Sequence, residues 1–571
     1  MAKAQAKRNA PVRKSATPTP VQGDAPDYNW KVIVPVAAAA LFFALGLGNE
    51  MTGLDDHAST VENPAVTSFA PDTIFTNFNL GMYAPITWIG YAIAYALGKD
   101  SAFWYHLLSW GVHVFNTWLL CKMLERLPLR PAIALPVALL FAIHPIQAES
   151  VAWIAGFSTP LFSMFSLLGF NAYLRFSDES EQKTKFYLLA LLFFVLACLS
   201  KSAAVTFPLT LAVIDWWRRP EGLTLQKQAI RYAPFFLIAL GFGLLTIYTR
   251  EVSGTMVGES ANGYSAFERV LLVCYAPLFY IGKILMPWNL NVYYSFDKVN
   301  GALPTIYYIT PFLLLLLGVL AWVWRKSAPF FWIGLAFFFS NIVIALPFAS
   351  LGTFELCADH YNYLACIGIF YLLAEGVAYL KQKMSGSQTL LTAVSGIWVL
   401  AIALLCVRQV RIWKDTLTVI TNAIENGYSH RGMMFLGRGT EMADKGRFPD
   451  AISDFSKAIE QDPTLREAYR SRGSLYAQAG QIDLALKDME IYLKYDSVDV
   501  VTWNNLGQIY YRQGKFPKAL QAFTKTIELK PDAAISYQSR AKVYEVLGDT
   551  ARMRADLNQA RAIAQNKQQG E

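Results

Sequence analysis

The chain has 571 residues, of which 54% are hydrophobic, and a formal net charge of +8. Its mean hydropathy of +0.29 is typical of a membrane protein with a polar C-terminal third. Most basic residues before that third lie in short segments between apolar runs, so the charge does not indicate a nucleic-acid partner. The six cysteines show no CxxC spacing, which indicates neither a zinc site nor a disulfide framework; we expect no metal and no cofactor.

Residues 1–30 are predicted to be a disordered cytoplasmic tail. The segment carries five lysines and arginines and no acidic residue before Asp24. No small-residue cleavage site follows the first apolar run, so we interpret that run as an anchor rather than a removed signal peptide.

Apolar runs predict an all-α, polytopic membrane bundle of about eleven spans within residues 31–408. Two further apolar stretches, 82–97 and 266–286, are interpreted as helices in or near the outer membrane interface. The predicted spans are 31–48, 102–122, 131–145, 160–175, 186–200, 202–217, 232–249, 306–325, 329–348, 360–380 and 388–406.

The basic residues fall on alternate sides of these runs, and the positive-inside rule assigns the basic side to the cytoplasm. An odd number of spans then puts the C-terminal part on the opposite face. Segments 49–101 and 250–305 face outward in the same scheme. We therefore expect a multi-pass membrane protein with a cytoplasmic N-terminus and an extracytoplasmic C-terminal domain. The compact chain and its plain N-terminal tail favour a bacterial inner membrane, in which the C-terminal domain is periplasmic.

Asp55 and Asp56 follow the first predicted span and are candidates for a catalytic pair. Adjacent carboxylates at the outer membrane surface suit a general base that takes a proton from an attacking hydroxyl. A solvated acidic loop explains the dipeptide equally simply. Lys201 and Arg250 lie at predicted helix ends, where they could hold a phosphate, cap a helix or touch lipid headgroups.

Residues 427–571 repeat with a period of 34, and a linker helix is predicted over 409–426. Glycines recur at this spacing in two sets, and a third set is alanine. This period is the signature of tetratricopeptide (TPR) repeats, which are helix-turn-helix units, so we predict an α-solenoid of about four repeats. The recurring positions are Gly446, Gly480, Gly514 and Gly548; Gly439, Gly473 and Gly507; and Ala451, Ala485 and Ala519.

The first helices of the repeats are predicted to line a concave groove that binds a polypeptide. Their Asn, Arg and Tyr side chains suit hydrogen bonds to a peptide backbone and to acidic side chains. A merely solvated solenoid face and self-association are the alternatives. The candidate groove residues are Tyr469, Arg472, Asn504, Gln508 and Tyr511.

Several motifs in order along the chain resemble the TMTC-type O-mannosyltransferases, which belong to the GT-C class of membrane glycosyltransferases. The resemblance covers nearly the whole chain after residue 30 and ends in the TPR repeats. It rests on LDDHASTVENPAV (54–66), MYAPITWIGYAIAYALG (82–98), LLFAIHPIQAESVAWIAG (139–156), LSKSAAVTFPLTLAVIDWW (199–217), LMPWNLNVYY (285–294) and CADHYNYLACIGIF (357–370).

The resemblance implies a GT-C-like helical core with an outward-facing catalytic loop after the first span. It also implies a sugar donor on a polyprenyl or dolichyl phosphate and an inverting, metal-independent transfer to a hydroxyl. The acidic motif of the family falls on Asp55 and Asp56. Its other motifs fall on His144 and Glu149, on Lys201, and on Asp359, His360, Tyr361 and Tyr363.

Two positions depart from the family pattern. His360 stands where the family usually has arginine, and the stretch 156–160 (GFSTP) lacks the charged Gly-Arg-x-Asp element. The departures imply a changed donor site or a loss of catalysis.

The sequence therefore predicts a glycosyltransferase that moves a sugar from a polyprenyl phosphate to a hydroxyl on protein. The resemblance suggests mannose as this sugar. Asp55 or Asp56 supplies the base, and Lys201 with Arg250 holds the departing phosphate. The alternative is a non-enzymatic scaffold that uses its TPR repeats to organise an envelope or secretion complex. A lipid-linked glycan transporter is less favoured, because the spans show no internal pairing of broken helices.

Overall fold

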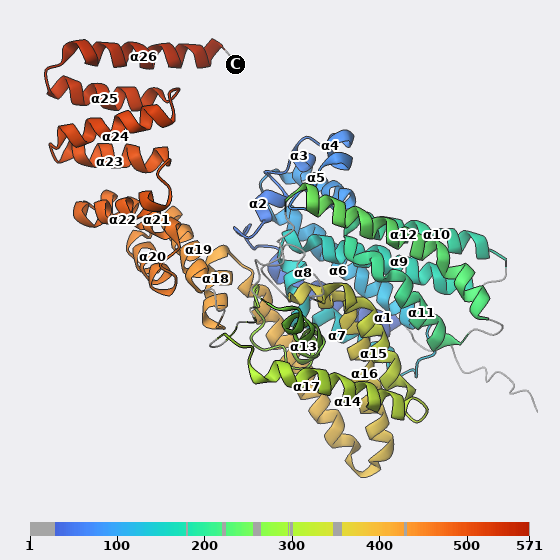
Figure 1. The fold of residues 1–571 in the computed structure, drawn as a ribbon. Helices are drawn as coiled ribbons and strands as arrows, with labels where there is room; N and C mark the ends of the chain where they lie inside the picture. The colour runs from blue at the N-terminus through green and yellow to red at the C-terminus, as the bar shows by residue number, and fades with distance from the viewer. Residues whose placement is uncertain are drawn as a thin grey trace, which may run out of the picture.

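The computed structural model describes residues 29–178, 181–219, 224–254, 264–294, 296, 298, 301–346, 357–427 and 431–569. Nearly all of the predicted N-terminal tail, residues 1–28, lies outside this part. Within it the chain is helical and contains no strand, apart from an isolated bridge between Asn79 and Met82. The predicted all-α class is confirmed. A bundle of helices and a separate stack of helical pairs make up the molecule (Figure 1).

The bundle contains helices of very different length. They are α1 (Asn29–Phe43), α2 (Asp56–Ser59), α3 (Pro64–Thr67), α4 (Pro71–Thr76), α5 (Pro85–Gly98), α6 (Ala102–Leu124), α7 (Ala134–Ile143), α8 (Ala148–Ala152), α9 (Ser158–Asp178), α10 (Lys183–Ser200), α11 (Phe207–Arg218), α12 (Leu225–Val252), α13 (Ala266–Leu285), α14 (Thr305–Trp324), α15 (Pro329–Ile342), α16 (Asn362–Lys383) and α17 (Gln388–Ile412).

Short 3-10 turns connect or extend several of these helices. They are η1 (Ala44–Gly46), η2 (Pro145–Gln147), η3 (Ala155–Phe157), η4 (Ser202–Thr206), η5 (Val343–Ala345), η6 (Asp359–Tyr361) and η7 (Ser385–Ser387).

The stack begins with α18 and continues as four antiparallel helix pairs (Figure 1). Its helices are α18 (Thr416–Glu425), α19 (Arg431–Asp444), α20 (Phe448–Gln461), α21 (Arg466–Gln478), α22 (Ile482–Tyr495), α23 (Val500–Arg512), α24 (Phe516–Leu529), α25 (Ala534–Val546) and α26 (Thr550–Gln569).

The predicted number of about eleven membrane spans is wrong by the criterion of helix length and apolarity. Five helices in the described part are long and apolar enough to cross a membrane: α10, α12, α14, α16 with the preceding η6, and α17. The number rises to six if α7 and the segment Pro145–Ala152, which meet at a bend of 49°, form one span. The argument from an odd span count to the side of the TPR array therefore fails.

Two physical causes explain the difference. Proline interrupts some predicted spans, because it cannot donate a backbone hydrogen bond inside a helix; α7 ends just before Pro145. Other helices are long but too polar: α6 has 23 residues, and several of its polar side chains are buried inside the bundle rather than facing lipid. Those side chains are His106, Ser109, His113, Asn116 and Thr117.

The chain nevertheless runs back and forth between two ends of the bundle. At one end, Asp178, the last residue of α9, pairs with Arg126 after α6, at 3.4 Å, and with Arg218 at the end of α11. Arg130 pairs with Glu375 in the second half of α16 at 3.3 Å. We call this the basic end. Helices α8, α10 and α17 finish at the opposite end, which carries Asp55 and its neighbours.

The TPR prediction is confirmed by backbone conformation and packing. Gly446, Gly480, Gly514 and Gly548 all have φ between +70° and +74°, in the turn between the two helices of each pair. Glycine adopts this left-handed region without a steric penalty. At Gly507 a methyl group would lie 2.6 Å from the ring of Phe523, so the small residue lets the two helices touch.

Three of the four repeats contain an arginine–aspartate pair between their two helices. Arg472 holds Asp488 with two hydrogen bonds of 2.7 and 2.9 Å, and the side chains are 17% and 4% exposed. In the third repeat both positions change together to Leu506 and Ala522, which are buried. An apolar pair of fitting volume can replace a buried ion pair, whereas a lone buried charge is costly. The other two pairs are Arg438–Asp454 and Arg540–Asp556.

We predict that Asp488→Ala destabilises the second repeat by about 3 kcal/mol, because the charge of Arg472 loses its partner. The double variant Arg472→Leu, Asp488→Ala, which copies the third repeat, should recover most of this loss. Amide hydrogen exchange in α21 and α22 measures both. As a control, Asp450→Ala removes the partner of Arg447 in an exposed pair and should change little. Equal exchange in the single and double variants would refute the explanation.

Candidate functional site

Asp56 is a buried carboxylate whose oxygens are already occupied. Its Oδ2 accepts hydrogen bonds from the backbone N–H and the hydroxyl of Thr52, at 2.7 and 2.8 Å, and its Oδ1 accepts one from Ala155 N at 2.8 Å. The residue is 1% exposed. Burial raises the pKa of Asp56 to about 7, while these hydrogen bonds oppose the rise. Asp56 thus joins the loop after η1 to the segment after α8.

Asp55 differs from its neighbour in every respect. It is exposed, and its carboxylate accepts no hydrogen bond from the described residues. Its φ of 63° lies in the left-handed region, which costs a non-glycine residue roughly 1–2 kcal/mol. Desolvation raises the pKa of Asp55 above its usual 3.8. Strained residues of this kind cluster at functional sites, so Asp55 is the better candidate for a base.

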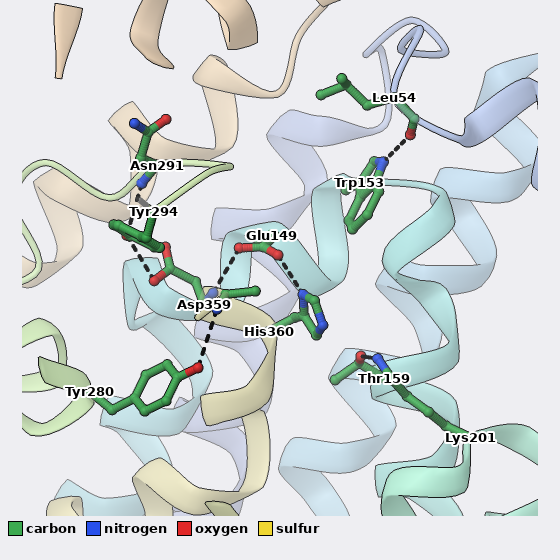
Figure 2. Close-up of polar contacts among 11 residues, drawn as sticks. Leu54, Glu149, Trp153, Thr159, Lys201, Tyr280, Asn291, Tyr294, Asp359 and His360 are labelled. Atoms are coloured by element: carbon green, nitrogen blue, oxygen red, sulfur yellow. Dashed lines mark hydrogen bonds and ion pairs between the residues drawn. The ribbon is translucent and has the colours of Figure 1, made fainter. Parts of the chain in front are cut away.

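Glu149 is the centre of a second, buried cluster (Figure 2). Its Oε2 accepts a hydrogen bond from Asp359 N at 3.0 Å, and its Oε1 lies 2.5 Å from His360 Nδ1. Asp359 in turn accepts from the hydroxyl of Tyr294 at 2.9 and 3.1 Å. Glu149 is 3% exposed and Asp359 2% exposed. The carboxylate of Glu149 therefore fixes the orientation of the imidazole of His360 and leaves its Nε2 for another partner.

Lys201 lies beside this cluster, at the C-cap of α10. Its Nζ donates to the hydroxyl of Thr159 at 2.7 Å (Figure 2). The same atom lies 5.9 Å from the centre of the Tyr361 ring. Burial lowers the pKa of Lys201 to about 8, while the charge of Glu149 opposes this. Thr159 belongs to the stretch that lacks the family's charged element, and here it supplies a neutral partner for the lysine.

Trp153 connects the Asp55 loop to the Glu149 cluster. Its Nε1 donates to the carbonyl of Leu54 at 2.7 Å, and its ring lies 6.3 Å from that of His360 (Figure 2). The carbonyl belongs to the residue directly before Asp55. The Asp55 loop and the buried cluster are thus linked through Trp153 at one end of the bundle.

Other predicted site residues lie in different surroundings. His144 is fully buried, with Nε2 2.9 Å from Ile284 O and Nδ1 accepting from Ile146 N, so it caps the turn at the bend after α7. The hydroxyl of Tyr363 lies 2.7 Å from His113 Nδ1 inside the bundle core. Arg250, near the end of α12, is half-buried and interacts electrostatically with Tyr361.

Sequence reasoning missed several residues of the site. Trp153 and Thr159 are neutral, and a search for charged motifs does not single them out. Lys283 on α13 lies 4.9 Å from the ring centre of Tyr294 and donates to Asn289 O at 2.8 Å. Its position as a single charged residue within the apolar stretch 270–285 was the available signal. Among the described residues, no group of three or more His, Cys, Asp or Glu side chains is placed to hold a metal ion.

The predicted TPR groove residues divide into two sets. Asn504, Gln508 and Tyr511 follow one another at i, i+4 and i+7 on α23 and therefore share a face. The side-chain oxygen of Asn504 is buried and has no hydrogen-bond partner in the described part of the chain. Arg472, in contrast, points between the two helices of its repeat to Asp488. Tyr469 is half-buried and packs near this arginine.

Comparison with known proteins gives two kinds of match. Family models described as Tetratricopeptide repeat match residues 436–499 and 500–533. The same region is similar to the crystal structure of MamA, with 24% identity, a TM-score of 0.26, and coverage of 27% of this chain and 90% of that chain.

Two relatives extend beyond the repeats. The chain is 23% identical over 465 residues to the protein O-mannosyl-transferase F38B6.6 of Caenorhabditis elegans, covering 76% of this chain and 63% of that protein. It is 29% identical over 239 residues to the protein O-mannosyl-transferase Tmtc2 of Drosophila melanogaster, covering 40% of this chain and 25% of that protein. The chain thus spans less than two thirds of the length of either relative.

The structure defines the class as a helical membrane protein that carries a TPR array. Over 76% of its length the chain is similar to a TMTC-type protein O-mannosyl-transferase, and its C-terminal part matches the Tetratricopeptide repeat models.

We predict that the thermal stability of the wild type falls as pH rises from about 4 to about 7. The pKa of Asp56 is higher in the folded state than its ordinary 3.8, so the folded state binds the proton more tightly, and this contribution is lost as pH rises through the folded pKa. Asp56→Asn should flatten this dependence. It should also lower the melting temperature, because an amide NH2 cannot accept from Thr52 N or Ala155 N.

The matched control is Asp72→Asn, which changes an exposed acid on α4. It should keep the pH dependence and melting temperature of the wild type. An Asp56→Asn variant with an unchanged pH profile, measured by differential scanning fluorimetry from pH 4 to 8, would contradict the assignment.

Proposed function

We propose that the protein is a membrane glycosyltransferase of the GT-C type that moves a sugar from a polyprenyl-phosphate donor to a hydroxyl on protein. The observation that carries the proposal is that Trp153 links the loop of Asp55, an exposed carboxylate on a strained backbone, to the buried Glu149–His360 pair. The relatives are named as O-mannosyl-transferases, so mannose is the sugar to test first.

The proposed reaction is a single inverting displacement. The acceptor oxygen attacks the anomeric carbon and transfers its proton to Asp55, while the bond from that carbon to the phosphate oxygen breaks. The polyprenyl phosphate leaves as a stable anion, so no acid need protonate it. Asp55 suits the role of base because its carboxylate is exposed and has no competing donor among the described residues.

The donor phosphate is proposed to bind near Lys201. Its ammonium has one neutral partner, Thr159, and can donate further hydrogen bonds to an anion. Arg250 lies on α12, which packs against η4 directly after Lys201. His360 completes the pocket, since Glu149 holds its Nδ1 and leaves Nε2 for the substrate. In this proposal His360 stands where the family usually has arginine, and it contacts the sugar donor through an imidazole instead of a guanidinium.

The site is proposed to lie on the extracytoplasmic side, which in a bacterial inner membrane is the periplasm. Arg126, Arg130 and Arg218 gather at the opposite end of the bundle through ion pairs with acidic residues of neighbouring helices. Basic residues favour the cytoplasmic side of a membrane. Helix α17 ends at the site end, so the TPR array is on the same side as Asp55 whatever the number of spans.

The TPR array is proposed to bind the acceptor polypeptide. Asn504, Gln508 and Tyr511 lie on one face of α23 and provide two amides and a phenol, which suit hydrogen bonds to a peptide. The non-enzymatic scaffold remains the competing function. Mass spectrometry of lipid that copurifies with the protein separates the two, because a bound polyprenyl-phosphate sugar is expected only for the enzyme.

Asp55→Asn is predicted to keep the fold and to reduce sugar transfer by roughly 10² to 10⁴-fold, since a positioned base contributes about that factor. The measurement is transfer of radiolabelled mannose from polyprenyl-phosphate mannose to a serine- and threonine-containing acceptor by the reconstituted protein. In the wild type the transfer rate should fall as the pH is lowered, with a midpoint above pH 3.8. The pKa of Asp55 is raised above 3.8, so its carboxylate is protonated, and lost as a base, at a higher pH than an ordinary aspartate. Transfer at the wild-type rate by Asp55→Asn would remove Asp55 from this role.

Lys201→Met is predicted to raise the KM for the lipid donor by roughly 10- to 100-fold, because a charged hydrogen bond to the phosphate is lost. The KM for the acceptor should change little. Lys185→Met, which removes an exposed lysine near the start of the same helix, is the control and should behave as wild type. A Lys201→Met variant with an unchanged donor KM would show that the phosphate binds elsewhere.

A further inference from the structure

Residues 410–416, from the last turn of α17 to the first residue of α18, connect the membrane bundle to the TPR array and lie directly against the Asp55 loop. This loop comprises residues 47–55, between η1 and α2. The two segments are more than 350 positions apart in the chain. Nothing in the sequence indicates that they meet.

Hydrogen bonds join the two segments along their length. The backbone N–H of Glu50 donates to the carbonyl of Lys414 at 2.8 Å. The backbone N–H of Gly53 donates to the hydroxyl of Thr416 at 3.0 Å. A longer contact of 3.4 Å runs from the side-chain amide of Asn49 to Val410 O.

An aromatic pair reinforces the junction. Trp413 is 2% exposed and stacks on Trp153, with ring centres 5.6 Å apart and an interplanar angle of 23°. Trp153 is the residue that donates to Leu54 O. Trp413 thus supports the contact that holds the carbonyl group immediately before Asp55.

These contacts surround the one strained residue of the loop. Before Asp55, the backbone N–H groups of Glu50 and Gly53 donate to the junction, and the carbonyl of Leu54 accepts from Trp153. The backbone N–H of Thr52 donates to Asp56. After Asp55, helix α2 begins. A residue in the left-handed region persists only where its surroundings determine the backbone on both sides.

We propose that Thr416 and Trp413 are positioning residues for Asp55, so that the connection to the TPR array forms part of the catalytic site. The proposal rests on the proposed function in one respect, the role of Asp55 as base. The first repeat also reaches the loop, through Lys445 and Glu50 at 3.7 Å, but this pair is exposed and contributes little. The anchor is the junction segment itself.

Four full-length variants test the proposal. Thr416→Val keeps the shape of the side chain and removes the hydroxyl that accepts from Gly53, whereas Thr416→Ser keeps the hydroxyl. Thr421→Val makes the same chemical change on the same helix, where the hydroxyl contacts Arg438 and not the loop. Trp413→Leu removes the aromatic stack and is a second, independent disruption.

The first readout is amide hydrogen exchange of residues 50–56 in the reconstituted protein, which requires no activity. Exchange should be roughly fivefold faster in Thr416→Val and Trp413→Leu, as expected for the loss of one net hydrogen bond, and unchanged in Thr416→Ser and Thr421→Val. Exchange in α21 and α22 should be unchanged in all four variants, which excludes general unfolding of the array. Wild-type exchange in the loop of Thr416→Val would overturn the proposal.

The second readout is sugar transfer. Thr416→Val should lower kcat roughly 10- to 100-fold, because a base displaced by about 1 Å loses its geometry, while the donor KM stays near the wild-type value. Faster exchange with an unchanged kcat would also overturn the proposal, since the loop would then be anchored without positioning Asp55. If the wild type transfers no sugar while the exchange differences are observed, the proposed function fails and the structural anchor stands.

Discussion

The structure of the site depends on two buried carboxylates that accept hydrogen bonds from distant backbone N–H groups. Asp56 accepts from Ala155 N, 99 positions away, and Glu149 accepts from Asp359 N, 210 positions away. A buried carboxylate without such donors would be strongly unfavourable. The two residues therefore bring the loop after η1, the segment around α8 and the start of α16 together, and Asp55, His360 and Lys201 take their positions from this arrangement.

The same constraint shapes the rest of the molecule. In the TPR array, Asp488 is buried only because Arg472 forms two hydrogen bonds with it, and the third repeat avoids the charge by changing both positions to apolar residues. In the bundle, some of the polar side chains of α6 that turn inward find partners, as Asn116 Nδ2 does with Pro160 O at 2.8 Å. Where two helices approach most closely, at Gly334 and Gly368 on α15 and α16, there is no room for a side chain, and the backbones touch instead.

Sequence reasoning succeeded where a local pattern carries the information. The 34-residue period predicted the TPR helices because each repeat places a glycine in the same left-handed turn, as at Gly480 and Gly514. It failed on the number of membrane spans, because apolarity alone cannot recognise a helix such as α6, whose histidines and asparagine are buried against protein. It also grouped Tyr363 with Asp359 and His360, although the tyrosine points one helical turn away into the core.

The sequence by itself determined the helical class, the repeat array and the position of the acidic pair, because these follow from the order of residues over a few tens of positions. Only the tertiary structure distinguished Asp55 from Asp56. The two are neighbours of the same type, yet the donors that occupy Asp56 include one from a segment about a hundred residues away, and none of the described residues donates to the side chain of Asp55. The contact between the junction at Thr416 and the loop at Gly53 is equally long-range. Such contacts depend on how helices pack in three dimensions, which no local pattern encodes.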